Sequence, residues 1–160
     1  RRACDMTRKP GKPSRITRDK LFLSEHSPIR TIQYWIELHG IPSFVSTHLV
    51  RHKFGVEHFV ESNRDDRGGA GDEVVNRLTP VNHGMLVNAM ALINISRKRL
   101  CYNSHRSTVA VWIRVVKELA RVTPAIKPYL VPECIYRGGK CPELKMCKPG
   151  LDAVMRAYAK

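Results

Sequence analysis

The spacing of apolar and polar residues predicts a strand, a helix and a second strand in the first half of the chain. Residues 31–39, TIQYWIELH, place apolar side chains at nearly every second position, the period of a half-buried strand. Pro42 suits the first turn of a helix, because Leu49 and His52 then continue a stripe at helical spacing. Residues 54–60, FGVEHFV, are rich in aromatic and β-branched side chains and favour a second strand.

Longer helices are predicted in the second half. Thr79 and Pro80 have the character of an N-cap and a first helical residue, and a helical stripe continues from there to residue 99 through Leu86, Met90, Ile93 and Arg97. Another amphipathic helix is expected over residues 107–122, where Pro124 ends it. The rest of the chain is rich in proline, so we expect mostly turns with a short helix over residues 151–158.

These elements predict an α/β protein of the α+β kind, with a mixed sheet packed by long helices. At 160 residues the chain has the size of one domain. We expect a basic and flexible segment over residues 1–20, a ligand-binding domain over 21–130, and an extension rich in cysteine and proline over 131–160. The polar, glycine-bearing residues 62–79 are expected to form a loop or linker, able to close over a ligand.

No stretch of the sequence indicates a membrane protein. No apolar run approaches the roughly 18 residues that a membrane span requires. The N-terminal residues are basic but have no apolar stretch behind them, so they do not predict a secretory signal. We therefore expect a cytoplasmic protein.

The net charge is strongly positive. The chain carries 28 Lys and Arg against 14 Asp and Glu, a formal charge of +14, which indicates an anionic partner: a nucleic acid or a phosphorylated small molecule. Residues 1–30 hold nine of the basic side chains against three acids, as a nucleic-acid-binding arm or a solvated tail would. Aromatic residues make up only 7% of the chain and none lies within the basic residues 1–20, which weakens the nucleic-acid interpretation.

Residues 47–67 form the densest group of ionisable side chains. THLVRHKFGVEHFVESNRDDR contains four basic residues, four acids and three histidines, so its formal charge cancels within a basic protein. A stretch that served only the core would not hold so many ionisable groups. The pattern indicates either a functional site or a solvated segment with surface ion pairs.

Four cysteines offer a set of metal ligands. Cys134, Cys141 and Cys147 lie in the proline- and glycine-rich run PECIYRGGKCPELKMC, and Cys101 follows the predicted long helix. Four thiolates would satisfy the tetrahedral preference of zinc, so we consider a structural zinc site. The spacing C-x6-C-x5-C lacks a close C-x2-C pair, and unpaired thiols or disulfides remain as alternatives.

Several motifs together resemble the flavin-dependent thymidylate synthases. After the first predicted strand and helix come RHK at 51–53, FVESNRDD with Ser62 and Arg64, and VNAMALINISRKR at 87–99. The family signature RHRxxSxNExSxRY is matched at its start and, with one inserted residue, at its Ser-x-Arg end. The segment EHSPIR is similar to the family's HxTPFEH. The likeness spans roughly residues 24–122, and the cysteine-bearing tail resembles a short, phage-borne branch.

The resemblance implies a homotetrameric α/β enzyme that binds FAD and dUMP where subunits meet, in the host cytoplasm if the chain is phage-encoded. Such an enzyme moves a methylene group from methylenetetrahydrofolate to C5 of dUMP. Flavin hydride, supplied by NADPH, reduces that group and gives dTMP. The cofactors carry this chemistry, while the protein orients them and stabilises developing negative charge.

The resemblance also implies roles for particular residues. Flavin-binding positions of the family are matched by Arg51, His52, Lys53, Asn88 and Asn94. Lys53 stands where the signature has arginine, which keeps the charge but not the planar fork of donors.

Nucleotide-binding and catalytic positions are matched by Ser62, Arg64 and Arg99, and His48 stands at a substrate-binding position where the family has glutamine. Guanidinium donors suit a phosphate dianion, so we expect Arg64 and Arg99 to hold one phosphorylated pyrimidine together. Ser62 has no evident base beside it, so positioning is expected rather than nucleophilic attack.

Other functions remain open. The Asn-Glu pair of the signature is replaced near residues 58–60, and the net charge is +14. Both features fit a non-enzymatic protein that keeps the fold and binds nucleotides or nucleic acid. A further alternative is a pyrimidine-modifying relative with a different one-carbon product.

Overall fold

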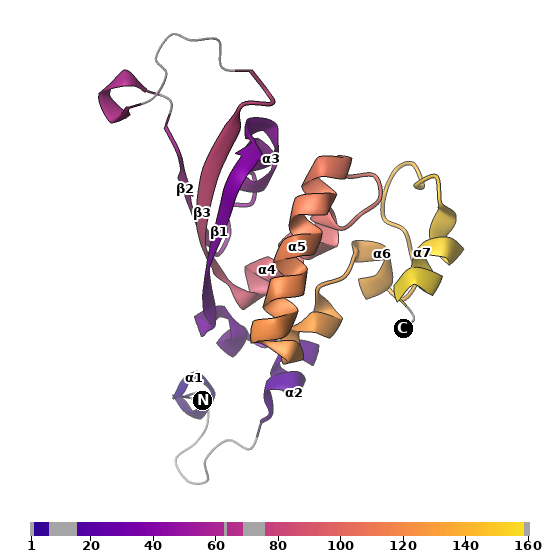
Figure 1. Cartoon of the computed structure of the whole chain (residues 1–160). Coiled ribbons are helices and arrows are strands. Elements are labelled where there is room, and N and C mark those ends of the chain that lie inside the picture. Colours follow the sequence, from indigo (N-terminus) through magenta and orange to yellow (C-terminus); the bar gives the residue numbers. More distant parts are fainter. Residues whose placement is uncertain (1, 7–15, 63, 69–75, 159–160) are drawn as a thin grey trace.

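The computed structural model describes residues 2–6, 16–62, 64–68 and 76–158 (Figure 1). Residue 63 and residues 69–75 of the expected glycine-bearing loop lie outside this description, and so do residues 7–15 of the N-terminal segment. The described elements are α1 (Arg2–Met6), α2 (Arg18–Leu23), η1 (Ser27–Thr31), β1 (Gln33–Pro42), α3 (Ser43–Val50), β2 (Val56–Val60), η2 (Asp65–Arg67), β3 (Pro80–Asn88), α4 (Ala89–Arg99), α5 (Arg106–Val122), η3 (Pro124–Tyr129), α6 (Glu133–Tyr136) and α7 (Gly150–Tyr158).

The sheet has three strands in the order β1-β3-β2, and β3 pairs antiparallel with both neighbours. One face holds the residues that alternate toward the core, such as Met85, which pairs with Ile36 on β1 and His58 on β2. Helices α3, α4 and α5 pack at this side, and α6 and α7 lie beyond them (Figure 1). The fold is therefore α+β as expected, although the described sheet is antiparallel rather than mixed.

The opposite face of the sheet is open. Trp35 and Phe59 lie on it, each 55% exposed, with ring centroids 5.4 Å apart. Gly84 lies beneath them on β3, and a Cβ there would come within 3.1 Å of the Trp35 ring. The glycine thus makes room for the tryptophan.

The predicted helix over residues 79–99 is wrong in its first half. Residues 80–88 form β3, whose alternate side chains Val81, Met85 and Val87 are buried between two partner strands. Helix α4 begins only at Ala89, and the Asn88 side-chain oxygen caps it by accepting a hydrogen bond from the Ala91 amide at 2.9 Å. Leu86 fitted the predicted helical stripe by coincidence. It lies four residues before Met90, and a spacing of four residues fits both the two-residue period of a strand and one turn of a helix.

The remaining predictions of local structure are largely confirmed. Strands β1 and β2 and helices α3, α5 and α7 lie where the pattern placed them, with end shifts of a few residues. Within residues 1–20, for which the pattern predicted no helix or strand, the structure has helix α1, which buries Cys4, and the start of α2 at Arg18. In the described parts of the chain, no helix is both long and apolar enough to cross a membrane.

Candidate functional site

The predicted triplet Arg51-His52-Lys53 lies in the turn between α3 and β2, residues 51–55, here called the α3–β2 turn. The turn is fixed by Gly55, which has φ +74° and whose carbonyl accepts a hydrogen bond from the Asn88 amide at 2.9 Å. A Cβ on Gly55 would lie 2.3 Å from the Asn88 side-chain nitrogen, so only glycine fits. The triplet is therefore held beside the start of α4.

Arg99, at the end of α4, joins the α3–β2 turn from the other side. Its Nε donates to His52 Nε2 at 2.8 Å, and its terminal nitrogen donates to the His48 carbonyl. Because the guanidinium can only donate, His52 Nε2 is the unprotonated nitrogen and the ring proton sits on Nδ1. Burial, followed by the charges of Arg99 and His58, lowers the pKa of His52 to about 4, so the ring is neutral at pH 7.

The cluster around this turn is positively charged. Arg51 and Lys53 are exposed, and neither side chain has a hydrogen bond or an ion pair with the described residues. Arg99 has no carboxylate partner there either. Burial, and then the charge of Arg51, lowers the pKa of Arg99, yet a guanidinium stays protonated at neutral pH. Three cations without a neutralising carboxylate make a place where an anion binds favourably.

Two hollows open beside the turn. Arg51 and Lys53 border one of 330 Å³, together with Ser46, Thr47, Val50 and Val60. His52 and Arg99 border another of 250 Å³, which Lys98 and Glu143 also line. Arg51 and Lys53 of the triplet thus border one hollow, and His52 between them borders the other.

A buried chain of hydrogen bonds supports the same turn from the core. His58 Nε2 lies 2.8 Å from the His52 carbonyl, His58 Nδ1 lies 2.9 Å from His83 Nε2, and His83 Nδ1 lies 3.0 Å from Ser46 Oγ. Since the carbonyl only accepts, His58 Nε2 donates to it, and one proton lies in each of the two further contacts, between His58 and His83 and between His83 and Ser46. His83 is 1% exposed, and burial, followed by the charge of His58, lowers its pKa to about 4.

His48 reaches toward the start of α5. Its Nδ1 lies 2.8 Å from the hydroxyl of the buried Thr108, and its ring is 5.7 Å from that of Phe44 and 6.2 Å from that of His105. Burial, and then the charges of Arg99 and Arg51, lowers the pKa of His48. The predicted substrate-binding histidine therefore lies beside the cationic cluster and is disfavoured from taking a charge itself.

The single chain does not bring Ser62 and Arg64 to this cluster. They follow β2 at its far end, where Ser62 Oγ accepts from the Arg64 amide at 3.3 Å. Arg64 makes a two-pronged pair with Asp66, at 2.9 Å for both hydrogen bonds, and its side chain is 71% exposed. Figure 1 places η2 beyond the strands and away from α4. For Ser62, Arg64 and Asp66, the structure of the single chain agrees with a solvated segment that contains surface ion pairs.

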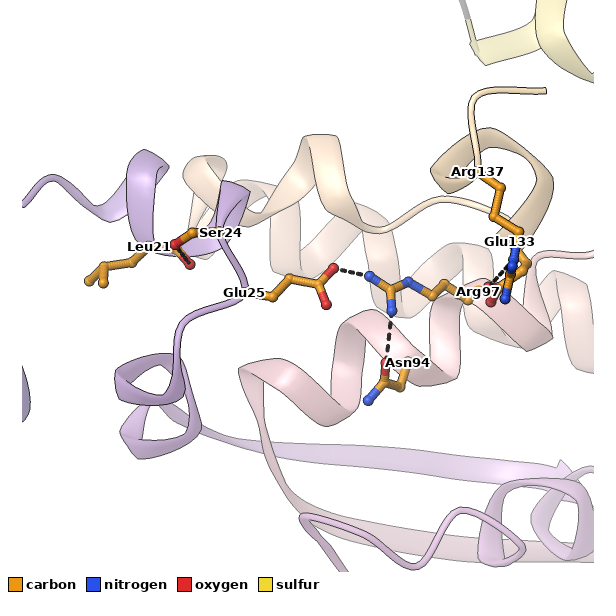
Figure 2. A network of polar contacts seen from close by, with 7 residues as sticks. All are labelled: Leu21, Ser24, Glu25, Asn94, Arg97, Glu133 and Arg137. Atoms are coloured by element: carbon orange, nitrogen blue, oxygen red, sulfur yellow. Dashed lines mark hydrogen bonds and ion pairs between the residues drawn. The ribbon is translucent and has the colours of Figure 1, made fainter. Parts of the chain in front are cut away.

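The two predicted asparagines lie in different environments. Asn88 caps α4 next to Gly55 and so lies beside the α3–β2 turn. Asn94 accepts a hydrogen bond from Arg97 at 3.1 Å and belongs to another network. Figure 2 shows Arg97 reaching from α4 between Asn94 and Glu25, with which it forms an ion pair. The Arg97 guanidinium also lies 3.5 Å from the centre of the Tyr136 ring, so it joins three segments of the chain.

The four cysteines named as metal ligands line one small cavity between the end of α4 and the C-terminal segment. Burial raises the pKa of the Cys101 and Cys134 thiols, and the neighbouring thiols contribute to both shifts. In the described residues, no three His, Cys, Asp or Glu side chains converge as ligands of one metal ion. The four thiols therefore surround one cavity, but their sulfur atoms are not at the distances from a common centre that a metal ion requires.

The sequence pattern gave no sign of several residues that build the site. His83, Ser46 and Thr108 are buried polar residues that hold the turn and His48. His83 was hidden because it fell within a predicted helix. If residues 80–88 had been predicted as a strand, His83 would have stood out as a polar residue at a position that faces the core.

A scan against protein-family models found no match, and no curated protein matches the chain. Function is therefore inferred from the chain's own residues and their geometry.

Proposed function

We propose that this chain is a flavin-dependent enzyme similar to the flavin-dependent thymidylate synthases, converting dUMP to dTMP with methylenetetrahydrofolate and NADPH. The observation that carries the proposal is the cationic cluster at the α3–β2 turn. Arg51, Lys53 and Arg99 meet there without a carboxylate partner among the described residues, next to a neutral His52. A nucleotide or dinucleotide, with its phosphates and a flat ring, has the matching charge and shape.

The residues of the turn fit FAD in charge and donor type. Bound FAD would supply the hydride that reduces the transferred one-carbon group. Arg51 and Lys53, exposed and unpaired with the described residues, would bind its phosphate oxygens. Arg99 is half-buried and would place positive charge near the nucleotide, while His52, kept neutral by burial and then by the charge of Arg99, offers a ring N–H.

The proposed site is completed by further copies of the chain. Hollows of 330 and 250 Å³ are at or below the lower end of the roughly 300–1,000 Å³ of ligand sites, and a dinucleotide needs more walls than one chain provides. In this proposal Arg64 of a second copy, whose exposed pair with Asp66 is weak, exchanges that carboxylate for the substrate phosphate. Oligomerisation would then be a condition of activity.

The direct test uses the full chain purified without added flavin, followed by incubation with FAD and removal of the excess. We expect a yellow protein, reduced by NADPH and reoxidised only when dUMP and methylenetetrahydrofolate are both present, with dTMP as the product. Flavin uptake without dTMP would favour a relative with another one-carbon product. Absence of flavin uptake at any FAD concentration tested would refute the proposal.

Paired variants locate the site. Arg51→Ala with Lys53→Ala should weaken FAD uptake at least about tenfold, because each charged hydrogen bond contributes about 1.5–3 kcal/mol. Lys117→Ala, an exposed cation on α5 away from the turn, is the control and should bind FAD as the parent chain does. Equal FAD affinity in the double variant and the control would move the flavin away from this turn.

A second candidate is non-enzymatic binding of single-stranded nucleic acid. The adjacent and exposed rings of Trp35 and Phe59 on the open sheet face favour it, because nucleobases stack on such rings. Glu37, which accepts a hydrogen bond from Trp35 at 2.7 Å, places a negative charge on the same face and opposes it. Binding of oligonucleotides with a steep salt dependence, lost in Trp35→Ala and without flavin uptake, would select this function.

A further inference from the structure

The C-terminal segment is folded with almost no core of its own. Of residues 131–158, only Pro132 and Val154 are buried, and the described backbone there contains two short helices and turns at Gly138, Gly139 and Gly150 with positive φ. Hydrogen bonding ties it to the rest of the chain at single points, such as Asn103 to the Lys145 carbonyl at 2.7 Å. So small a unit usually needs a covalent or metal cross-link to hold one conformation.

Four cysteines meet where this segment joins α4. Cys101 follows the end of α4, Cys134 lies in α6, and Cys141 and Cys147 lie in the turns between α6 and α7. All four line a single cavity of about 20 Å³ and none is in a disulfide. A cavity of this size holds one water molecule or one small ion.

We propose that these four cysteines bind one zinc ion, or another soft divalent cation, as a structural tetrathiolate site that fastens the C-terminal segment to α4. Zn–S bonds of about 2.3 Å put the sulfurs of a tetrahedral site roughly 3.8 Å apart. The thiols surround the cavity without reaching that arrangement, so binding requires the turns that carry Cys141 and Cys147 to close inward.

The neighbouring charges fit this ligand set. The carboxylates that line the cavity are engaged elsewhere, since Glu133 accepts from Arg137 at 2.8 Å and Glu143 lies 3.9 Å from Lys98. Residues 133–148 carry four cations and two carboxylates, a surplus of two positive charges. Binding releases the four thiol protons, and the resulting site has a charge of 2 − 4 = −2, which this surplus balances.

Metal content decides the proposal without reference to flavin. The full chain is produced in zinc-supplemented medium and purified with a phosphine reductant and no chelator, and its metal is measured by elemental analysis. We expect about one zinc ion per chain, protection of four thiols from a thiol reagent until a chelator is added, and cobalt substitution that gives the absorption bands of a tetrahedral thiolate site.

Variants then assign the ligands. Cys134→Ser and Cys141→Ser should each lower the affinity for zinc at least about tenfold in a competition titration, since even outer-shell changes reach this size. Cys4→Ser, in α1 and away from the cavity, is the matched control and should keep its zinc. Cys141→His retains a zinc ligand, so its zinc content separates a lost ligand from a misfolded chain.

Two results would overturn the proposal. One is wild-type protein that contains no zinc, takes up none on titration and has four freely reactive thiols. The other is a disulfide between any two of the four cysteines that forms in air, with dissolved oxygen as the oxidant, and persists in the presence of zinc. Flavin uptake by the same protein is measured separately, so a failure of the zinc proposal is distinguishable from a failure of the proposed function.

Discussion

Acid should weaken the fold through His83. This ring is 1% exposed and has a pKa of about 4, against an ordinary value near 6.5. Since the folded pKa is depressed, the unfolded chain binds the proton more readily between pH 6.5 and 4. The contribution of His83 to stability is therefore fully present above pH 6.5 and is lost as the pH falls toward 4. A shift of this size corresponds to about 3 kcal/mol of unfolding free energy.

The measurement is urea unfolding, followed by far-ultraviolet circular dichroism, at several pH values between 7.5 and about 4. His83→Gln removes the titrating ring while keeping a side chain that can hydrogen-bond with Ser46 or His58. We expect this variant to be less stable than the parent at pH 7.5 and to lose about 3 kcal/mol less on acidification. His26→Gln, an exposed histidine with no described side-chain contact, should follow the parent chain.

Parallel pH profiles for the parent chain and His83→Gln would refute the reasoning. They would mean that His83 accepts a proton in the folded state at little cost, and that the hydrogen bonds from Ser46 through His58 to the His52 carbonyl do not require a neutral ring.

The ion pair between Glu25 and Arg97, 22% and 10% exposed in their side chains, predicts that Glu25→Ala lowers the unfolding free energy by about 3 kcal/mol, because an unpaired guanidinium is left buried. Glu118→Ala removes the exposed partner of Arg121 and should cost less than about 1 kcal/mol, so equal losses in urea titrations would contradict this assignment. Gly55→Ala places a Cβ 2.3 Å from the Asn88 side chain at φ +74°, so we expect it to destabilise the chain by more than about 1 kcal/mol. Gly138→Ala, with φ +62° and no atom within 4 Å of its Cβ, carries backbone strain alone, and a thermal melt in which it is the more damaging change would refute the contact argument.

The spacing of apolar residues was sufficient to predict an element where one face of that element packs on the core and the other faces solvent. β1 and α5 were predicted from their own residues because alternation and helical spacing are visible within a few turns of chain. β3 failed this test, since Pro80 at its start also suits a helix and Leu86 happens to fall on the helical stripe. Only pairing with β1 on one side and β2 on the other distinguishes the two conformations, and pairing is not visible in one segment.

The candidate site was predictable in its parts but not in its assembly. The charges of residues 51–53 and their place after α3 follow from the sequence. The contact of Arg99 with His52, 47 residues away, depends on how α4 returns along the sheet and could not be inferred from spacing. Likewise the predicted partnership of Arg64 with Arg99 came from the family resemblance and from residue type, and within one chain Arg64 pairs with Asp66 two residues away.

The two tryptophans lie in opposite environments, and this gives the chain a pair of separate optical reporters. Trp112 is fully buried and donates to Ser96 at 2.9 Å, so its emission should be blue-shifted and insensitive to iodide. Trp35 stands on the uncovered face of the sheet against Phe59, where iodide can reach it. Quenching that disappears as the concentration of chain or nucleotide rises would reveal an encounter on that face, while the Trp112 signal continues to follow the integrity of the core.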